Sequence, residues 1–372
     1  MIESELHNNN PQGAFSELKK WYRKVTGRPL RPTREETKTL QADRQHLYTK
    51  ETHLPKMFLI VSTSFQVDDS VPEEEEIKIA LSRLKNGKSP GASNLTVDQL
   101  KMWMRISDKK PEPWQKVIQL VQEAFCSGRI PLRLSQAVCV LIPKNGKGEF
   151  RGIGLLESIW KLITAIINRR MARDIELHDA HHGFRPGRGT GTAIMETKLR
   201  MQLARRQGWP YFQVFLDLTK AYDTLDRDRT LEILAKYGVG ENIRRILSRF
   251  WANHWVVTKQ ATYFGAPFQA TRGVTQGDII SPMLFNLVVD AVIRAWEHQM
   301  DEPLSALAEI DCAFYADDGK LGGWDAPRIQ RSLDIFKRLF SCVGLWMNAK
   351  KTQEMITKGR VETIHQTVPP ER

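Results

Sequence analysis

The sequence has few cysteines and no long apolar run. None of its four cysteines, Cys126, Cys139, Cys312 and Cys342, forms a C-x-x-C pair, which argues against a zinc site or a disulfide framework. No apolar segment approaches the roughly 18 residues that a membrane-spanning helix needs. The first residues, MIESELHNNNPQG, lack the basic-then-apolar order of a signal peptide. We therefore expect reduced, mostly buried thiols in an intracellular protein, nuclear or cytoplasmic, that is neither secreted nor bound to a membrane.

Basic residues are in excess. The 372 residues include 55 Lys and Arg against 43 Asp and Glu, for a formal net charge of +12. Such a charge favours a polyanionic partner, either nucleic acid or an anionic membrane surface, and does not choose between them. The length suggests about two or three domains or one large interleaved body.

The chain alternates between helical and strand-like patterns. Residues 1–72 are polar, basic and interrupted by proline, so we expect an extension outside the main core with one helix in AFSELKKWYRKV. Helical patterns follow in EEEEIKIALSRLK, LTVDQLKMWM, WQKVIQLVQEAF, SIWKLITAIINRRM, NIRRILSRFW, QGDIISPMLFNLVVDAVIRAW and IQRSLDIFKRLFSCVGL. Strand patterns occur in AVCVLIPK, RGIGLL, QVFLDL, AEIDCAFYADDGKLGG and MNAKKTQEMIT. The mixture predicts an α+β fold.

Three aspartates follow apolar runs that we expect to be strands. Asp217 ends FLD, and Asp317 and Asp318 follow FYA about a hundred residues later. Alone, such an aspartate is more often part of a turn or a helix cap. If the two strands pair antiparallel or lie adjacent, however, the carboxylates meet at one edge of a sheet, where repulsion raises a pKa unless a cation lies between them. Two Mg²⁺ ions about 3.5 to 4 Å apart would resolve that repulsion.

A second acidic cluster has a simpler interpretation. Asp223, Asp226 and Asp228 in DTLDRD superficially suggest a calcium loop. The segment lacks the central glycine and the closing glutamate of such a loop, so we expect a solvated helix start instead.

Six segments resemble, in order, the polymerase motifs of reverse transcriptases, especially those of non-LTR retrotransposons and group II intron proteins. They are LIPKNGKGEFRGI, HHGFRPGRGTGTA, VFLDLTKAYD, TRGVTQGDIISPMLFNLVVD, FYADD and GLWMNAKKTQ, and the match runs over roughly residues 75 to 358. The resemblance implies the fingers and palm of a right-hand polymerase, with an antiparallel palm sheet backed by helices and no thumb. It divides the chain into a basic extension (1–72), fingers (73–208), a palm with an interleaved fingers segment (209–358) and a C-terminal tail (359–372).

The resemblance assigns the metal ligands. Asp217 and Asp317 would ligate two Mg²⁺ ions, for which Mn²⁺ could substitute. Asp318 would line the same site as a less essential carboxylate, and the carbonyl of Leu218 would be a further ligand. Lys351 would protonate the pyrophosphate leaving group, with Lys350 as the neighbouring alternative.

It also assigns the substrate contacts. Lys144 and Arg151 would contact the triphosphate of the incoming dNTP, and these residue types suit phosphate binding. Tyr222 would be the steric gate that excludes a ribose 2′-hydroxyl, and Gln276 and Gly277 would pack beneath the nascent base pair. For the template, the resemblance points to Phe184, Arg185 and Arg188.

Two residues depart from the family pattern. Gly152 stands where proline usually follows the fingers arginine, which leaves the backbone beside Arg151 less rigid. Asp278 stands where a small residue is common, and we expect its charge to alter template contacts or metal affinity.

The resemblance implies an RNA-directed DNA polymerase that adds dNTPs to a DNA primer on an RNA template by two-metal phosphoryl transfer. Two alternatives stay open. One is a catalytically inactive, RNA-binding remnant, although such remnants commonly lose a metal aspartate, and Asp217, Asp317 and Asp318 are all present. The other is a polymerase resembling a group II intron maturase, a retron or a telomerase. The sequence says nothing about the oligomeric state.

Overall fold

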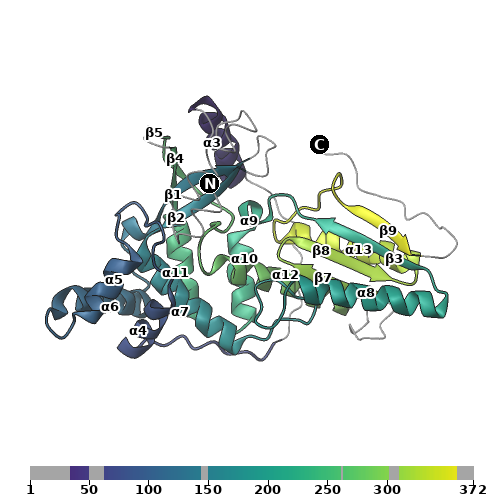
Figure 1. Ribbon diagram of the computed structural model, residues 1–372, viewed down its shortest axis with the longest axis horizontal. Helices are drawn as coiled ribbons and strands as arrows, with labels where there is room; N and C mark the ends of the chain where they lie inside the picture. The colour runs from purple at the N-terminus through teal and green to yellow at the C-terminus, as the bar shows by residue number, and fades with distance from the viewer. Residues whose placement is uncertain (1–33, 50–62, 144–149, 261–262, 301–309, 358–372) are drawn as a thin grey trace, which may run out of the picture.

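A computed structural model describes residues 34–49, 63–143, 150–260, 263–300 and 310–357 (Figure 1). The helix expected in AFSELKKWYRKV lies outside these residues. All four cysteines are unpaired and three are buried, as the sequence predicts. Among the helices described, none is long and apolar enough to cross a lipid bilayer.

One end of the protein consists mainly of helices (left in Figure 1). They are α4 (Glu74–Arg83), α5 (Val97–Arg105), α6 (Pro111–Ser127), α7 (Ser158–Asp174) and α11 (Glu241–Ala252), with a short 3-10 turn at Leu132–Ser135. Acidic residues in the first turn of α4 and Arg83 in its last turn complement the helix dipole. Gly128, in the left-handed region at φ 67°, ends α6. These helices form where the sequence predicts them.

A small mixed sheet lies above these helices (Figure 1). Its strands are β1 (Gln136–Pro143), β2 (Phe150–Leu156), β4 (Trp255–Gln260), β5 (Tyr263–Phe264) and β6 (Phe268–Gln269). β1 pairs antiparallel with β2, so the strands predicted in AVCVLIPK and RGIGLL lie side by side, and it pairs parallel with β4.

The second sheet has four strands in the order β7-β8-β3-β9, each antiparallel to its neighbour. The strands are β3 (Tyr211–Asp217), β7 (Ile310–Tyr315), β8 (Asp318–Gly323) and β9 (Gln353–Thr357). One face packs on α13 (Ala326–Cys342), where Phe314 of β7 contacts Phe336 and Phe340. α8 (Thr190–Gln207) runs along the sheet beside β7 and β9.

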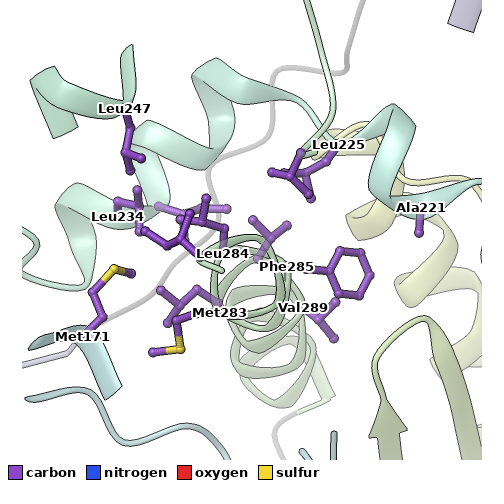
Figure 2. Close-up of a cluster of buried hydrophobic side chains, with 14 of the residues drawn as sticks. Met171, Ala221, Leu225, Leu234, Leu247, Met283, Leu284, Phe285 and Val289 are labelled. Carbon is purple, nitrogen blue, oxygen red and sulfur yellow. The ribbon is translucent and has the colours of Figure 1, made fainter. Parts of the chain in front are cut away.

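α12 (Ser281–Met300) is the central helix of the core, and nearly all of its residues are buried. Figure 2 looks along this helix, whose side chains spread toward the neighbouring segments. Met283 and Leu284 lie toward Leu234 of α10 (Arg227–Lys236), whereas Phe285 lies on the side of α9 (Ala221–Thr224). A single helix thus connects the helical end with the segment that follows Asp217.

The acidic segment DTLDRD does begin a helix. Asp226 is the N-cap of α10, and its side chain accepts a hydrogen bond from the Arg229 N–H (2.8 Å). The predicted helix start is therefore confirmed.

The N-terminal part contains a helix that the sequence did not predict. We expected residues 1–72 to lie outside the core, but α3 (Arg34–Thr49) packs on β4, β6 and α9. Tyr48 belongs to the hydrophobic core, and Val67 forms a bridge with Val239. The buried side chains of α3 are Thr37, Gln41 and Tyr48, so no apolar stripe marks this helix in the sequence.

We expect Phe336→Ala to lower the free energy of unfolding by about 3 to 5 kcal/mol, because the fully buried ring stacks on Trp296 and touches Phe314. Phe264→Ala is the matched control, since that ring is 54% exposed, and it should cost less than about 1 kcal/mol. Urea denaturation measures both, and equal losses would contradict this description of the core.

Candidate active site

The three aspartates meet at one edge of the four-stranded sheet. We expected the strands that end near Asp217 and Asp317 to pair or lie adjacent, but β8 lies between them. Because β3 and β7 are both antiparallel to β8, they run in the same direction and end at the same edge. Asp217 lies opposite Asp318 in the register, and Asp317 occupies the turn before it. The predicted convergence is correct, although the strand order that produces it differs.

The turn itself adopts an uncommon backbone conformation. Ala316 has φ 55°, in the left-handed region that residues other than glycine rarely adopt. Tertiary contacts hold it there: a Cβ atom on Gly183 would lie 2.7 Å from the Ala316 nitrogen. The close approach of Gly183 fixes the turn that carries Asp317.

The electrostatics reflect this crowding. Partial burial, and then the charges of Asp317 and Asp217, raise the pKa of the Asp318 carboxyl above its usual value. Burial, and then the charge of Asp317, raise the pKa of the Tyr222 hydroxyl. Tyr222 therefore lies close enough to Asp317 for the charge of that carboxylate to affect its hydroxyl.

The donor set suits hard cations. Asp317 and Asp318 are exposed, and carboxylate oxygens are the ligands that Mg²⁺ prefers. Within the described ranges, no group of three or more His, Cys, Asp or Glu side chains is placed to hold a metal ion. Mg²⁺ is usually held by one or two carboxylates, with water and substrate phosphates completing its shell, so it does not require a cage of protein ligands.

The segment that contains the predicted lysine is bonded to β3 beside the aspartates. The Asn348 N–H donates to the Asp217 carbonyl (2.8 Å), and the Thr219 N–H donates to the Trp346 carbonyl (2.8 Å). Neither bond uses the carbonyl of Leu218, the predicted metal ligand. The Lys351 N–H donates to the Asn348 carbonyl (3.1 Å), which places this lysine one turn away from Asp217. Lys350 is also exposed in this turn.

The predicted nucleotide-binding residues come from three segments that are bonded to one another. The Val274 N–H donates to the Tyr222 carbonyl (2.7 Å), and the Gly154 N–H of β2 donates to the Gln276 carbonyl (2.7 Å). Gly277, at φ 115°, has no room for a side chain, because a Cβ atom would lie 2.7 Å from the Gly154 oxygen.

The ring of Tyr222 is fixed as well, stacked on Phe285 of α12 at 5.0 Å between centroids. Arg151 is exposed on β2, three residues before Gly154. The predicted partner of this arginine, Lys144, lies outside the described residues.

Asp278 has a different role from the one we expected. Its carboxylate is buried and accepts hydrogen bonds from Trp160 Nε1 (2.8 Å) and Thr164 Oγ1 (3.0 Å) of α7. Burial, the largest influence, raises its pKa despite these bonds. The side chain links the segment before α12 to α7, and its burial leaves little surface for the template or metal contacts that we expected.

The glycine-rich basic loop that contains Phe184 is hydrogen-bonded to β7 through the residues just before it. The His182 N–H donates to the Phe314 carbonyl (2.8 Å), and the Phe314 N–H donates to the Ala180 carbonyl (2.7 Å). Phe184 is 58% exposed, and its ring lies 6.5 Å from that of Tyr315, next to the turn that carries Asp317.

The two arginines of the loop are already engaged. Arg185 donates to the His178 carbonyl (3.0 Å), and Arg188 pairs with Asp179. Their guanidinium groups therefore shape the loop, and a template phosphate would have to share them. Phe184 is the residue of this predicted set whose exposed ring is open to a base.

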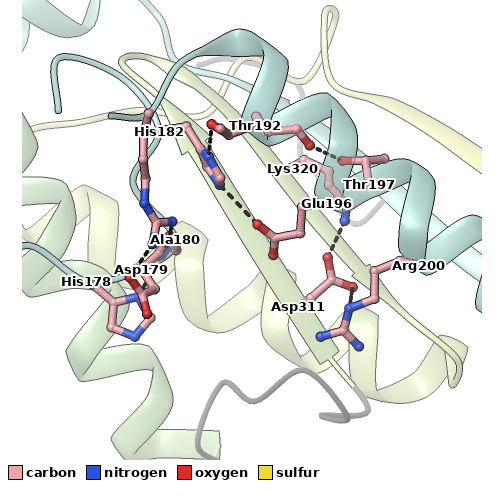
Figure 3. A network of polar contacts seen from close by, with 12 residues as sticks. His178, Asp179, Ala180, His182, Thr192, Glu196, Thr197, Arg200, Asp311 and Lys320 are labelled. Atoms are coloured by element: carbon pink, nitrogen blue, oxygen red, sulfur yellow. Dashed lines mark hydrogen bonds and ion pairs between the residues drawn. The ribbon is translucent and has the colours of Figure 1, made fainter. Parts of the chain in front are cut away.

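A polar network that the sequence analysis did not single out lies beneath α8 (Figure 3). His182 is hydrogen-bonded to Glu196 (3.1 Å), and Asp311 of β7 pairs with Lys320 of β8. Arg200 of α8 lies 4.0 Å from Asp311. α8 thus rests on the sheet through charges, which agrees with its having only two fully buried residues.

Lys320 carries a sequence signal for this network. It stands two residues after Asp318 in a strand of otherwise small or apolar residues, DGKLGG. Alternate residues of a strand share a face, so its buried ammonium lies on the same face of β8 as the Asp318 carboxylate.

The order of these segments along the chain is that of a known family. A family model described as reverse transcriptase (RNA-dependent DNA polymerase) matches residues 142–367, and the chain belongs to this family. The resemblance seen in the sequence is thereby confirmed.

Among known proteins, the chain is similar to retrotransposon products. It is 24% identical over 289 residues to the Pol polyprotein of the type-2 retrotransposable element R2DM of Drosophila melanogaster, covering 77% of the chain and 26% of that protein. It is 27% identical over 268 residues to the transposon TX1 149 kDa protein of Xenopus laevis, covering 69% of the chain and 20% of that protein. The chain therefore spans a minor part of the length of these relatives.

A solved structure of apo telomerase from Candida tropicalis, truncated from its C-terminal domain, also resembles the fold. The match has 15% identity and a TM-score of 0.46, and it covers 63% of this chain and 52% of the telomerase chain.

We expect Asp318→Asn to stabilise the protein at pH 7 when no divalent cation is present. The raised pKa means that the folded state binds this proton more tightly than the unfolded chain does. The stability from this group is therefore present below the usual Asp pKa and is lost as the pH rises through the folded value. A neutral amide does not lose this stability as the pH rises. The gain in the free energy of unfolding should therefore vanish below about pH 4, where the Asp318 carboxyl is itself protonated.

Urea denaturation at several pH values in EDTA measures this effect. Asp334→Asn, at an exposed position on α13, is the control and should give no pH-dependent gain. An Asp318→Asn variant that is less stable than the unmodified protein at pH 7 would contradict the repulsion.

Proposed function

We propose that the chain is an RNA-directed DNA polymerase of a non-LTR retrotransposon-like element, which adds dNTPs to the 3′-hydroxyl of a primer. The observation that carries this proposal is the convergence of Asp217, Asp317 and Asp318 at one sheet edge, within electrostatic reach of Tyr222. Membership of the reverse transcriptase family and similarity to the R2DM and TX1 proteins support it.

The aspartates would hold two Mg²⁺ ions, with the Leu218 carbonyl as a further ligand. Bound there, the ions would stabilise the charge that develops on the attacking and leaving oxygens of the phosphoryl transfer. The carboxylates themselves would keep the cations at the sheet edge. The turn contacts at Gly183 and Ala316 keep Asp317 aligned, so that little reorganisation accompanies the reaction.

Other residues would hold the nucleotide. Arg151, with Lys144, would bind the triphosphate, and Gln276 and Gly277 would support the nascent base pair. Tyr222, rigid because it stacks on Phe285, would reject the 2′-hydroxyl of a ribonucleotide. Lys351 would deliver a proton to the pyrophosphate leaving group from the turn beside Asp217.

In this arrangement residues 73–208 act as fingers and residues 209–358 as a palm with an interleaved fingers segment. The four-stranded sheet, which packs on α13, would be the palm sheet. The net charge of +12 would hold the template and primer phosphates without reading their sequence, so binding should weaken steeply with salt.

We expect purified protein with Mg²⁺ to extend a DNA primer on an RNA template, and Asp317→Asn to abolish extension. The amide is similar in size but supplies no negative charge for a cation, so affinity for the template–primer should change little. Gel-based primer extension and fluorescence anisotropy measure the two properties.

Asp334→Asn is the control and should extend as the unmodified chain does. If the unmodified chain binds RNA but gives no extension with Mg²⁺ or Mn²⁺, the activity is refuted for this chain, and an RNA-binding remnant is favoured. Full activity of Asp317→Asn would refute the assigned site.

We expect Phe184→Ala to weaken binding of an RNA template by roughly 5- to 100-fold, because a base stacked on the exposed ring would lose its platform. Phe264→Ala, which removes a similarly exposed ring on β5, should leave the affinity nearly unchanged. Anisotropy at one fixed salt concentration measures both variants, and equal affinities would remove Phe184 from the template site.

A further inference from the structure

Tyr48 joins two segments that are far apart in the sequence. It is the second-to-last residue of α3, and its side chain is only 7% exposed. Its hydroxyl donates a hydrogen bond to Asp223 Oδ1 (2.7 Å). Its carbonyl accepts two more, from the Thr271 N–H (3.1 Å) and from Thr271 Oγ1 (2.6 Å).

These two partners belong to the walls of the proposed nucleotide pocket. Asp223 directly follows Tyr222 in α9, and Thr271 begins the segment that leads to Gln276. The two segments are also bonded to each other, by the Val274 N–H to the Tyr222 carbonyl (2.7 Å) and by the Gly273 N–H to the Leu225 carbonyl (2.7 Å). Tyr48 therefore completes a closed set of bonds around Tyr222.

The surroundings of Tyr48 make its hydroxyl bond consequential. The Arg44 guanidinium of the same helix lies close to both Tyr48 and Asp223. It also fills the space over Gly152, where a Cβ atom would lie 2.3 Å from the guanidinium carbon. Without the Tyr48 hydroxyl, the half-buried Asp223 carboxylate loses its donor from α3 and must find another.

Tyr222 has two restraints of different kinds. Stacking on Phe285 fixes the plane of its ring, but a stacked ring can still slide, because dispersion has little directionality. The bond from Tyr48 to Asp223 fixes the backbone of α9, a helix of only four residues that cannot hold its own position. The position of the ring therefore depends on α3.

We propose that Tyr48 is a positioning residue for sugar selection, which holds Tyr222 where it excludes a 2′-hydroxyl by fastening α9 and the Thr271–Gly277 segment to α3. The inference rests on the proposed polymerase function. It assigns to the N-terminal helix a part in choosing between deoxyribonucleotides and ribonucleotides.

The test is the Tyr48→Phe variant, which keeps the ring and removes only the hydroxyl. The ratio of kcat/KM for a dNTP to that for the matching rNTP should fall by roughly 2- to 10-fold, the worth of one hydrogen bond. A purely structural role would lower both rates or the unfolding temperature, but it would leave this ratio unchanged.

Tyr237→Phe is the matched control. Its hydroxyl also donates to a carboxylate, that of Asp290, in the buried core. Removing it should lower stability without moving the ratio. At the partner position, Asp223→Asn keeps an acceptor oxygen and should preserve the ratio to within about twofold, whereas Asp223→Ala should reproduce the Tyr48→Phe result. An unchanged ratio in both Tyr48→Phe and Asp223→Ala would overturn the proposal.

A second measurement separates this proposal from the polymerase activity itself. If the unmodified chain extends no primer, the proposed function fails, but the affinities for dTTP and for its ribonucleotide counterpart can still be compared on a template–primer ending in a dideoxynucleotide. Tyr48→Phe should reduce that preference by the same factor. An equal preference in both proteins, or no preference in the unmodified chain, would refute the role of Tyr48.

Discussion

Repulsion among three carboxylates is the constraint on which the site depends. The sheet holds Asp217 and Asp318 opposite each other, with Asp317 in the adjoining turn. Partial burial, and then the charges of Asp317 and Asp217, raise the pKa of Asp318. Nothing in a hydrophobic core favours that arrangement, so it must be imposed by contacts elsewhere. α13 beneath the sheet and the loop paired with β7 supply those contacts. A divalent cation bound among them would offset the energetic cost of gathering these charges.

One helix links the parts of the site. Phe285 of α12 stacks on Tyr222, and Asp278 just before its first turn is bonded to α7. Near its middle, the fully buried Asp290 accepts a hydrogen bond from the His178 N–H (2.6 Å), at the start of the basic loop. A displacement of α12 would therefore disturb Tyr222, the helical end and the loop together.

The sequence predicted the helices and strands correctly wherever burial produces a local pattern of apolar residues. The apolar runs before Asp217 and Asp317 predicted β3 and β7, and the continuous pattern from Ser281 predicted α12. It could not reveal that β8 separates β3 from β7, because strand order depends on pairing between distant segments. The sequence did not predict α3, because the buried side chains of this helix are polar. It also could not predict the ion pair between Arg188 and Asp179, which depends on the shape of a loop.

The position of β3 in the sheet also sets an order of folding. Its two neighbours, β8 and β9, begin at Asp318 and Gln353, both about a hundred residues or more after Asp217. At a synthesis rate of about 5 to 20 residues per second, β3 waits roughly 5 to 20 seconds on the ribosome before either edge can pair. The edge that gathers the carboxylates is therefore among the last parts to form, and the nascent chain exposes an apolar strand until it does.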